Sequence, residues 1–379
     1  MRLQFRWGFL ILYGVSPMLA HGFALGRPDH QSLLITLIAV ALCAEWMFAQ
    51  QTTHGWGIVS GASWALALWV SLYEPLVLLM IVVACCARSM IKRERRIGWI
   101  VFAAVLAIAF IIERRFPVWP SREFGGALRN WSATVGELAH VSLASTIWFN
   151  WCGWLLVLAP ILLWPKRNRN TPIFLTVLLI STFALTIWQA RWSYFFVMIF
   201  VMLVPQILSL LRKPLIAATV FTVALFPIAQ AWDRAFADEE LVRRAETKIE
   251  RFELRTISSQ IDGPFIAPWW FSPAVSYWSR QAGVGGSSHE SIEGIVETAR
   301  FFETPIAEKA MQIIDRHNVD WIVSYDADRV AQNSAQVLGR ATPKNAFCYL
   351  LDRRPSEVPP FLRLIAQTGH FKLFRPEKS

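Results

Sequence analysis

Charged residues are scarce in this chain of 379 residues. They make up 17% of the sequence, whereas 55% of the residues are hydrophobic. A soluble domain usually carries roughly 25% charged residues. The composition therefore argues against a single water-soluble globule and favours burial in a membrane.

Cysteine is scarce as well. Of the five cysteines, four lie in or beside apolar stretches, and Cys348 stands alone in the more polar C-terminal part. Such an odd and scattered set provides neither a disulfide framework nor the spacing of a zinc site.

Acidic residues are few in the first part of the chain. Residues 1–232 contain 18 Lys and Arg but only 7 Asp and Glu, whereas residues 233–379 contain 19 and 20. Because the basic excess belongs to the apolar part, it indicates membrane topology rather than binding to nucleic acid. No nucleic-acid partner is expected.

Long apolar stretches fill these first 232 residues. A helix needs about 17–25 apolar residues to cross the hydrocarbon core of a bilayer. The first stretch lacks the small-residue cleavage site of a secretory signal, so it also counts as a span. The sequence predicts nine spans, near residues 7–25, 32–49, 55–72, 74–88, 97–113, 146–164, 171–189, 193–211 and 215–232.

The distribution of Lys and Arg over the short loops predicts the orientation. If the N-terminus is cytoplasmic, 12 of the 18 basic residues fall inside and six outside. Nine crossings then place the C-terminal part outside. We expect an integral protein, of a bacterial inner membrane, with an extracytoplasmic C-terminal domain.

Reporter fusions test this topology. A reporter that works only outside the cytoplasm is expected to be active after residue 240, and one that works only inside is expected to be active after residue 94. A cytoplasmic location of residue 240 would overturn the orientation and every functional assignment to the outer face.

The composition changes after Trp232. Charged residues dominate 233–257. Short β-like runs (263–270, 319–325 and 371–374) then alternate with helical patterns (291–302, 305–317 and 327–338), as in a small α/β domain. The segment 340–360 contains four prolines and is predicted as loop. The fold class is an α-helical multi-pass membrane protein of about nine spans with a small α/β outer domain, organised as 1–232 (transmembrane), 233–257 (charged juxtamembrane helix) and 258–379 (extracytoplasmic domain).

The first outer loop is short and polar, Gly26-Arg27-Pro28-Asp29-His30-Gln31. A carboxylate and an imidazole at the membrane surface can hold a divalent cation, or a diphosphate through one. The alternative is a turn in which Asp29 caps the next helix.

Two further outer segments carry candidate residues. Glu137 lies in the long loop 114–145, where it is either functional or a solvated surface residue. Arg191 lies between aromatic residues at the outer end of the seventh span. It either extends towards lipid headgroups or binds a phosphate, for which its fork of donors is suited.

In the outer domain, Trp269 and Trp270 end the first β-like run. They are either packing residues or part of a binding surface. His289 follows a glycine pair, but no second ligand stands at a metal spacing, so it is left unassigned.

Together these pieces resemble the catalytic-subunit family of oligosaccharyltransferases, membrane glycosyltransferases of the C architecture. That family has a Gly-x-x-Asp-x-[Asp/His] outer loop, matched here by Gly26–Gln31, and a [Ser/Thr]-[Ile/Val]-x-Glu motif, matched by Thr134–Glu137. It also has a diphosphate-binding Arg, matched by Arg191, and a Trp-Trp-Asp motif, matched by Trp269–Phe271. The resemblance is distant but covers nearly the whole chain in the same order.

The resemblance implies transfer of a glycan from a polyprenyl diphosphate to an acceptor on the outer face. It makes Asp29 and Glu137 the catalytic and metal-binding residues, with Mg or Mn as the divalent cation. Arg191, Trp269 and Trp270 become the substrate-binding residues. The implied partners are a lipid-linked oligosaccharide, membrane lipids and a protein or glycan acceptor.

Three features depart from the family pattern. Phe271 replaces the Asp that helps to hold an acceptor Ser or Thr, and Gln31 replaces an acidic or His ligand. The chain also starts at what would be the third or so span of the family, which implies an N-terminally shortened member that is either active or inactive. A non-catalytic protein that binds lipid-linked glycan or scaffolds polysaccharide assembly is the alternative. A transporter is disfavoured, because Glu45 is almost the only ionisable residue in the spans.

Overall fold

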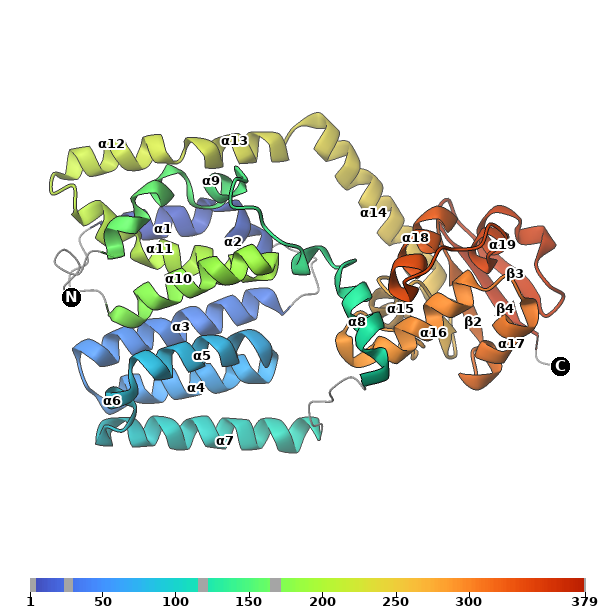
Figure 1. Cartoon of the computed structure of the whole chain (residues 1–379), viewed down its shortest axis with the longest axis horizontal. Coiled ribbons are helices and arrows are strands. Elements are labelled where there is room, and N and C mark those ends of the chain that lie inside the picture. The colour runs from blue at the N-terminus through green and yellow to red at the C-terminus, as the bar shows by residue number, and fades with distance from the viewer. Residues whose placement is uncertain (1–4, 24–29, 115–121, 164–171, 378–379) are drawn as a thin grey trace. The chain divides into compact units, whose positions relative to one another are not determined.

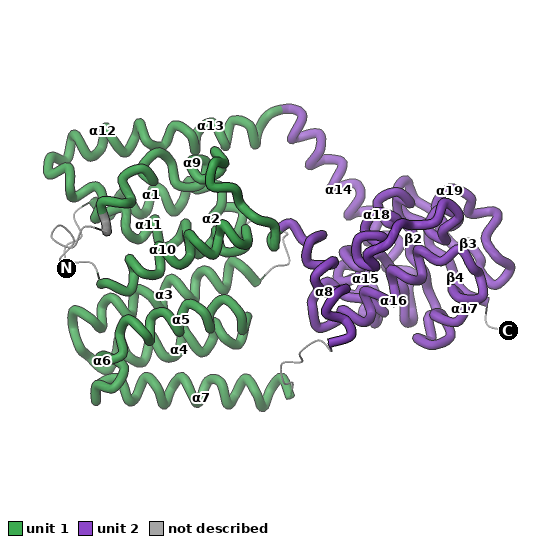
Figure 2. Tube along the Cα trace, in the orientation of Figure 1, with its two compact units in different colours: residues 1–116, 137–237 green, residues 117–136, 238–379 purple. Residues whose placement is uncertain are grey.

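A computed structural model describes residues 5–23, 30–114, 122–163 and 172–377. The chain divides into two compact units (Figure 2). Unit 1 comprises residues 1–116 and 137–237, and unit 2 comprises residues 117–136 and 238–379. The boundary near residue 237 lies close to the change in composition, but the assignment of residues 117–136 to unit 2 has no counterpart in the sequence pattern.

Unit 1 is a bundle of helices (Figure 1). Between several of them lie 3₁₀ segments, two of them short, η1 (Arg93–Arg95) and η5 (Ala190–Trp192), and one longer, η4 (Trp154–Leu163). The helices are α1 (Arg6–Val15), α2 (Pro17–Gly22), α3 (Gln31–Gln50), α4 (His54–Val70), α5 (Tyr73–Cys85), α6 (Ala87–Met90), α7 (Arg96–Glu113), α9 (Ile147–Cys152), α10 (Ile173–Trp188), α11 (Ser193–Ser209), α12 (Pro214–Ala224) and α13 (Phe226–Ala235).

Helical segments occur at all nine positions where the sequence predicts a span. Within the described residues, four helical stretches are long and apolar enough to cross a membrane: Gln31–Gln50, Arg93–Glu113, Ala190–Ser209 and Pro214–Ala235. The other predicted spans are shorter or interrupted, for example where Pro17 separates α1 from α2. Unit 1 is thus a membrane-type helical domain, and the number of nine crossings stays a prediction.

The buried fraction of each helix shows that α11 is central in unit 1 and α7 is peripheral. The stretch containing α11 is 89% buried and apolar on all sides, as expected of a helix enclosed by others. The stretch containing α7 is only 11% buried. Its outward residues, such as Ile100 and Ile111, are exposed within the protein and suited to contact with lipid.

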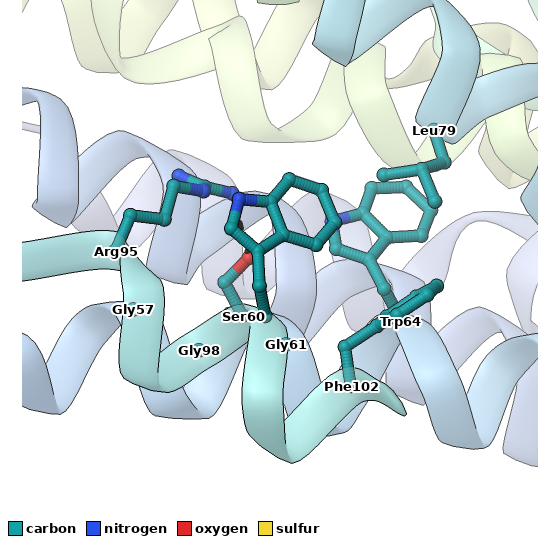
Figure 3. A pocket seen from close by; sticks show the side chains of 9 residues that line it. Gly57, Ser60, Gly61, Trp64, Leu79, Arg95, Gly98 and Phe102 are labelled. Atoms are coloured by element: carbon teal, nitrogen blue, oxygen red, sulfur yellow. Dashed lines mark hydrogen bonds between the residues drawn. The ribbon is translucent and has the colours of Figure 1, made fainter. Parts of the chain in front are cut away.

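Close packing attaches α7 to α4 (Figure 3). A Cβ atom added to Gly61 would lie 2.1 Å from the carbonyl oxygen of Gly98, and one added to Gly98 would lie 2.3 Å from that of Gly57. Only glycine permits two helix backbones to approach so closely. Small residues four apart, as at positions 57 and 61, are typical of such helix contacts in membranes.

A buried ion pair lies beside this helix contact. Arg95 donates from Nη1 to Glu45 Oε2 at 2.8 Å, and Ser60 Oγ donates to Glu45 Oε1 at 2.5 Å. All three side chains are buried. Glu45, which lies well inside the predicted span 32–49, is therefore neutralised by a partner on the 3₁₀ turn before α7, as the cost of an unpaired buried charge requires.

Unit 2 contains a four-stranded sheet in the order β1-β2-β4-β3. Strands β1 and β2 are parallel, and β4 is antiparallel to both β2 and β3. The strands are β1 (Phe265–Ile266), β2 (Trp321–Ser324), β3 (Leu362–Gln367) and β4 (Lys372–Pro376), and the helices are α8 (Gly125–Ser132), α14 (Asp238–Ser258), α15 (Ser272–Ser279), α16 (Ile292–Glu303), α17 (Ala307–Arg316), α18 (Ala327–Leu338) and α19 (Phe347–Arg353).

The prediction of a loop over residues 340–360 is wrong in its centre. Helix α19 forms there because Phe347, Cys348 and Leu351 lie on one face and are all buried. The prolines that suggested a loop lie outside this helix, before and after it. Strand β3 was also not predicted.

Two hydrophobic clusters stabilise unit 2. The larger one surrounds the sheet and includes Phe265, Ile322 and Phe374. The second joins α8 to α16 and α18, with Trp131 packed among Ile295 and its neighbours. Residues of the loop that follows α7 are thus part of the core of unit 2.

Unit 2 is expected to lose stability at high pH through Tyr325. Burial, followed by the hydrogen bond that its hydroxyl donates to Glu250, raises the pKa of Tyr325 to about 12. A raised pKa in the folded state gives stability that is complete below pH 10 and is lost as the pH rises towards 12. The loss is expected to be about 2 kcal/mol in denaturant unfolding.

The Tyr325→Phe variant should remove this pH dependence, whereas Tyr277→Phe, at an exposed tyrosine, should retain it. An unchanged pH profile in Tyr325→Phe would show that another group is responsible.

Candidate functional site

The first predicted site segment lies partly outside the described residues. Asp29 and the residues from Gly26 are not described, whereas His30 and Gln31 form the start of α3. Gln31 is buried. The structure therefore shows where this loop enters α3 and leaves the role of Asp29 as a prediction.

The structure brings the Glu137 segment beside the Arg191 segment. Glu137 lies in a 3₁₀ turn, η3 (Gly136–Leu138), and is partly exposed. Just after it, the carbonyl of Ala139 accepts a hydrogen bond from the backbone N–H of Ala190 at 2.8 Å, and Val141 N–H donates to the carbonyl of Ile187 at 3.1 Å. Two motifs about fifty residues apart in sequence thus share one end of unit 1.

Arg191 is held in place by two neighbours on α5. Its Nη2 forms an ion pair with Glu74 Oε1, and its guanidinium carbon lies 5.6 Å from the centre of the Tyr73 ring. The Glu74 carboxylate is fully buried, and its Oε2 accepts a hydrogen bond from Ser71 Oγ at 2.6 Å. The Arg191 side chain remains 23% exposed. Arg191 is therefore fixed by protein contacts and does not simply extend into the headgroups.

A second polar contact lies one helical turn further along the chain. His21 Nδ1 and the Tyr194 hydroxyl are 2.8 Å apart, and the two rings are stacked. A Cβ atom added to Gly22 would lie 2.9 Å from Ile35 and 3.3 Å from Tyr194. The C-terminal end of α2 and the beginnings of α3 and α11 therefore meet closely near Arg191.

Metal binding cannot be assigned to the described residues. Within these ranges, no group of three or more His, Cys, Asp or Glu side chains is arranged to hold a metal ion. Of the two predicted ligands, Glu137 is described and Asp29 is not. A divalent cation shared by these two residues stays a prediction.

The two predicted tryptophans of unit 2 pack against aromatic neighbours. Trp269 contacts Trp131 with the ring centres 5.8 Å apart, and Trp270 contacts Phe271 at 5.8 Å. Arg329 lies over the Trp270 ring at 5.7 Å. Both tryptophans are half-buried, and the buried indole N–H of each has no hydrogen-bond partner in the described part of the chain.

Phe271 occupies the position where the resembled family has an acidic residue. Its ring packs 4.8 Å from that of Tyr325 and 5.2 Å from that of Phe371. The position therefore contributes to an aromatic cluster and supplies no carboxylate. His289 starts a short 3₁₀ turn before α16 and is exposed, so it stays unassigned.

Glu74 is the site residue that sequence reasoning did not identify. Glu74 is the first residue of the predicted span 74–88, but no role was predicted for it. Its position directly after a tyrosine and before a proline, at the beginning of an apolar helix, was the available signal. Helix boundaries in membranes seldom bury a carboxylate without a partner, and Arg191 is the partner.

Comparisons with known proteins find similarity only at the level of solved structures. No family model matches the chain, and no curated protein matches it. One similar structure is the C-terminal globular domain of an oligosaccharyltransferase from Archaeoglobus fulgidus, with 17% identity, a TM-score of 0.28, and coverage of 33% of this chain and 95% of that domain.

A second similar structure is an oligosaccharyltransferase of the same organism tethered by a disulfide bond to an acceptor peptide containing an NVT sequon. It is 15% identical, with a TM-score of 0.43. The match covers 88% of this chain and 52% of that chain, so this protein spans about half the length of that enzyme.

Proposed function

We propose that this chain is an oligosaccharyltransferase-like membrane glycosyltransferase that moves a glycan from a polyprenyl-diphosphate donor to an acceptor on the outer face of the membrane. One observation supports the proposal above all. Backbone hydrogen bonds from Ala190 and Val141 hold the segment after Glu137 against the segment before Arg191. Two of the motifs that carry the family resemblance are thereby placed at one end of the helical unit.

Arg191 is suited to receive the diphosphate. Glu74 and Tyr73 fix its guanidinium, so little side-chain freedom is lost when a phosphate binds. Its side chain also remains 23% exposed, so a ligand can reach part of it. Donors not used by Glu74 can therefore stabilise the negative charge that develops on the leaving diphosphate.

Asp29 and Glu137 are the residues that would hold a divalent cation, with Mg or Mn as candidates, and the cation would add charge stabilisation at the same diphosphate. On the acceptor side we assign Trp269 and Trp270, whose rings are half-buried. The acceptor is a protein or a glycan.

The role of Glu137 is tested by a comparison of three acidic residues. Glu137→Gln is expected to remove most metal-dependent substrate binding, because a cation ligand needs a charged oxygen at about 2.0–2.6 Å. Glu113→Gln and Glu123→Gln change exposed carboxylates and are expected to be nearly silent. Binding of a lipid-linked oligosaccharide to the full chain, with and without Mn²⁺, is the measurement. Equal binding by all three variants would leave Glu137 as an ordinary surface glutamate.

The packing of Phe271 favours a second candidate function, a non-catalytic protein that binds lipid-linked glycan or scaffolds polysaccharide assembly. An aromatic cluster at this position offers no carboxylate to an acceptor hydroxyl. A chain that binds the lipid-linked donor through Arg191 but transfers glycan to neither peptide nor glycan acceptors would support this second function over the first.

A further inference from the structure

Helix α14 carries an apolar face that is exposed to solvent within the described protein. Val242, Ile249 and Phe252 lie on one side of the helix, seven and three residues apart, and their side chains are 58%, 54% and 69% exposed. A neighbouring face of the helix, with Leu254 and Ile257, is buried in the core of unit 2. Packing against the core of unit 2 does not cover this apolar stripe. An exposed apolar stripe on a helix usually marks a surface that binds another molecule or a membrane.

Two aromatic residues of α15 are exposed as well. Tyr277 is 70% and Trp278 is 42% exposed, and α15 packs on α14 within unit 2. The Arg255 guanidinium lies 4.7 Å from the Trp278 ring and connects the two helices. We refer to Val242, Ile249, Phe252, Tyr277 and Trp278 as the α14–α15 surface.

Charge is distributed unevenly around this surface. Lys248 and Arg251 are exposed on the side of α14 that faces away from the acidic edge, and neither makes an ion pair within the described residues. On the opposite edge, Glu250 and Glu253 turn inwards and hydrogen-bond to unit 2. Glu246 is an exposed acid of that edge. One border of the apolar surface is thus basic and available to an anionic partner.

The position of α14 in the chain identifies this partner. The helix begins at Asp238, three residues after the end of the apolar stretch Pro214–Ala235, which is long enough to cross a membrane. A helix that leaves a span with an apolar stripe, a basic border and exposed aromatic residues has the composition of helices that lie in the membrane interface. We propose that the α14–α15 surface docks on the bilayer, with Phe252, Tyr277 and Trp278 among the headgroups and the basic border against anionic lipid.

Spin-label accessibility tests the proposal on the full chain. The chain, with its native cysteines replaced by alanine or serine, is reconstituted in nanodiscs of phosphatidylcholine and phosphatidylglycerol, with a nitroxide at Ile249→Cys. A nitroxide at Thr247→Cys, on an exposed position of the opposite side, is the matched control. At position 249, relaxation by oxygen is expected to exceed relaxation by a water-soluble nickel chelate, because oxygen concentrates in lipid. At position 247 the order should be reversed, and in amphipol both positions should relax mainly with nickel.

The outcomes separate the possible occupants of the surface. Predominant nickel relaxation at position 249 in nanodiscs would overturn the proposal. Protection of position 249 from both reagents in nanodiscs and amphipol alike would assign the surface to another part of this chain or to a second copy, and would also overturn it. The double change Lys248→Glu and Arg251→Glu should lower the relaxation by oxygen at position 249 in anionic nanodiscs. Unchanged relaxation would overturn the part of the proposal that assigns the basic border to anionic lipid. Hydrogen exchange of α14 in the unmodified chain, slower in nanodiscs than in amphipol if the helix docks, gives an independent measurement in case the cysteine-free chain does not fold.

Discussion

Replacing Arg191 by alanine is expected to lower the affinity for polyprenyl diphosphate by roughly 100-fold, the value of about two charge-assisted hydrogen bonds. The same change should also destabilise unit 1 by about 3–5 kcal/mol. It leaves the fully buried Glu74 carboxylate without its cation. Binding of the lipid diphosphate to the full chain and thermal unfolding in the same detergent measure the two effects.

A double variant separates recognition from folding. Glu74→Gln combined with Arg191→Gln removes both charges and lets the two amides hydrogen-bond, so stability should largely return while diphosphate binding stays weak. Arg129→Ala, at an exposed arginine of unit 2, is the control for general loss of positive charge. Recovery of binding in the double variant would mean that Arg191 has only a structural role.

Introducing a methyl group at Gly61 is expected to have the second large effect. The new Cβ would lie 2.1 Å from a backbone oxygen of α7, which cannot move aside as a side chain can. The two helices must therefore separate, and we expect a loss of about 3 kcal/mol or more together with faster proteolysis in the segment that contains α7.

Gly55→Ala provides a matched control on the same helix, since nothing lies within 4 Å of its added Cβ. That variant should be neutral or slightly stabilised, because alanine has the higher helix propensity. Equal stability of the two variants would contradict the close contact between α4 and α7.

Local sequence patterns predicted most helices, because runs of apolar residues determine helices in lipid whatever their neighbours are. Helix α18 was predicted with its observed ends, Ala327 and Leu338, since an aspartate caps it and a glycine ends it. Strand β3 escaped prediction. Its residues 363–365 are all exposed, so no alternation of buried and exposed positions marks it.

The candidate site could be predicted only in part. Family motifs indicated Glu137 and Arg191, but not the ion pair that fixes Arg191. Glu74 lies more than a hundred residues before its partner, and no local pattern connects positions so far apart. The packing of Trp269 on Trp131 could not be predicted either, because these two residues are also far apart in the sequence.

The loop that joins α7 to the rest of unit 1 sets a condition on how this protein is made. Asn130 hydrogen-bonds to the carbonyl of Val337, 207 residues later, and Trp131 is buried by residues of α16 and α18. At a synthesis rate of roughly 5–20 residues per second, on the order of 10–40 s pass before these partners leave the ribosome. During that time the indole of Trp131 is not covered by its native partners. It is therefore a candidate contact for a chaperone or for the insertion machinery.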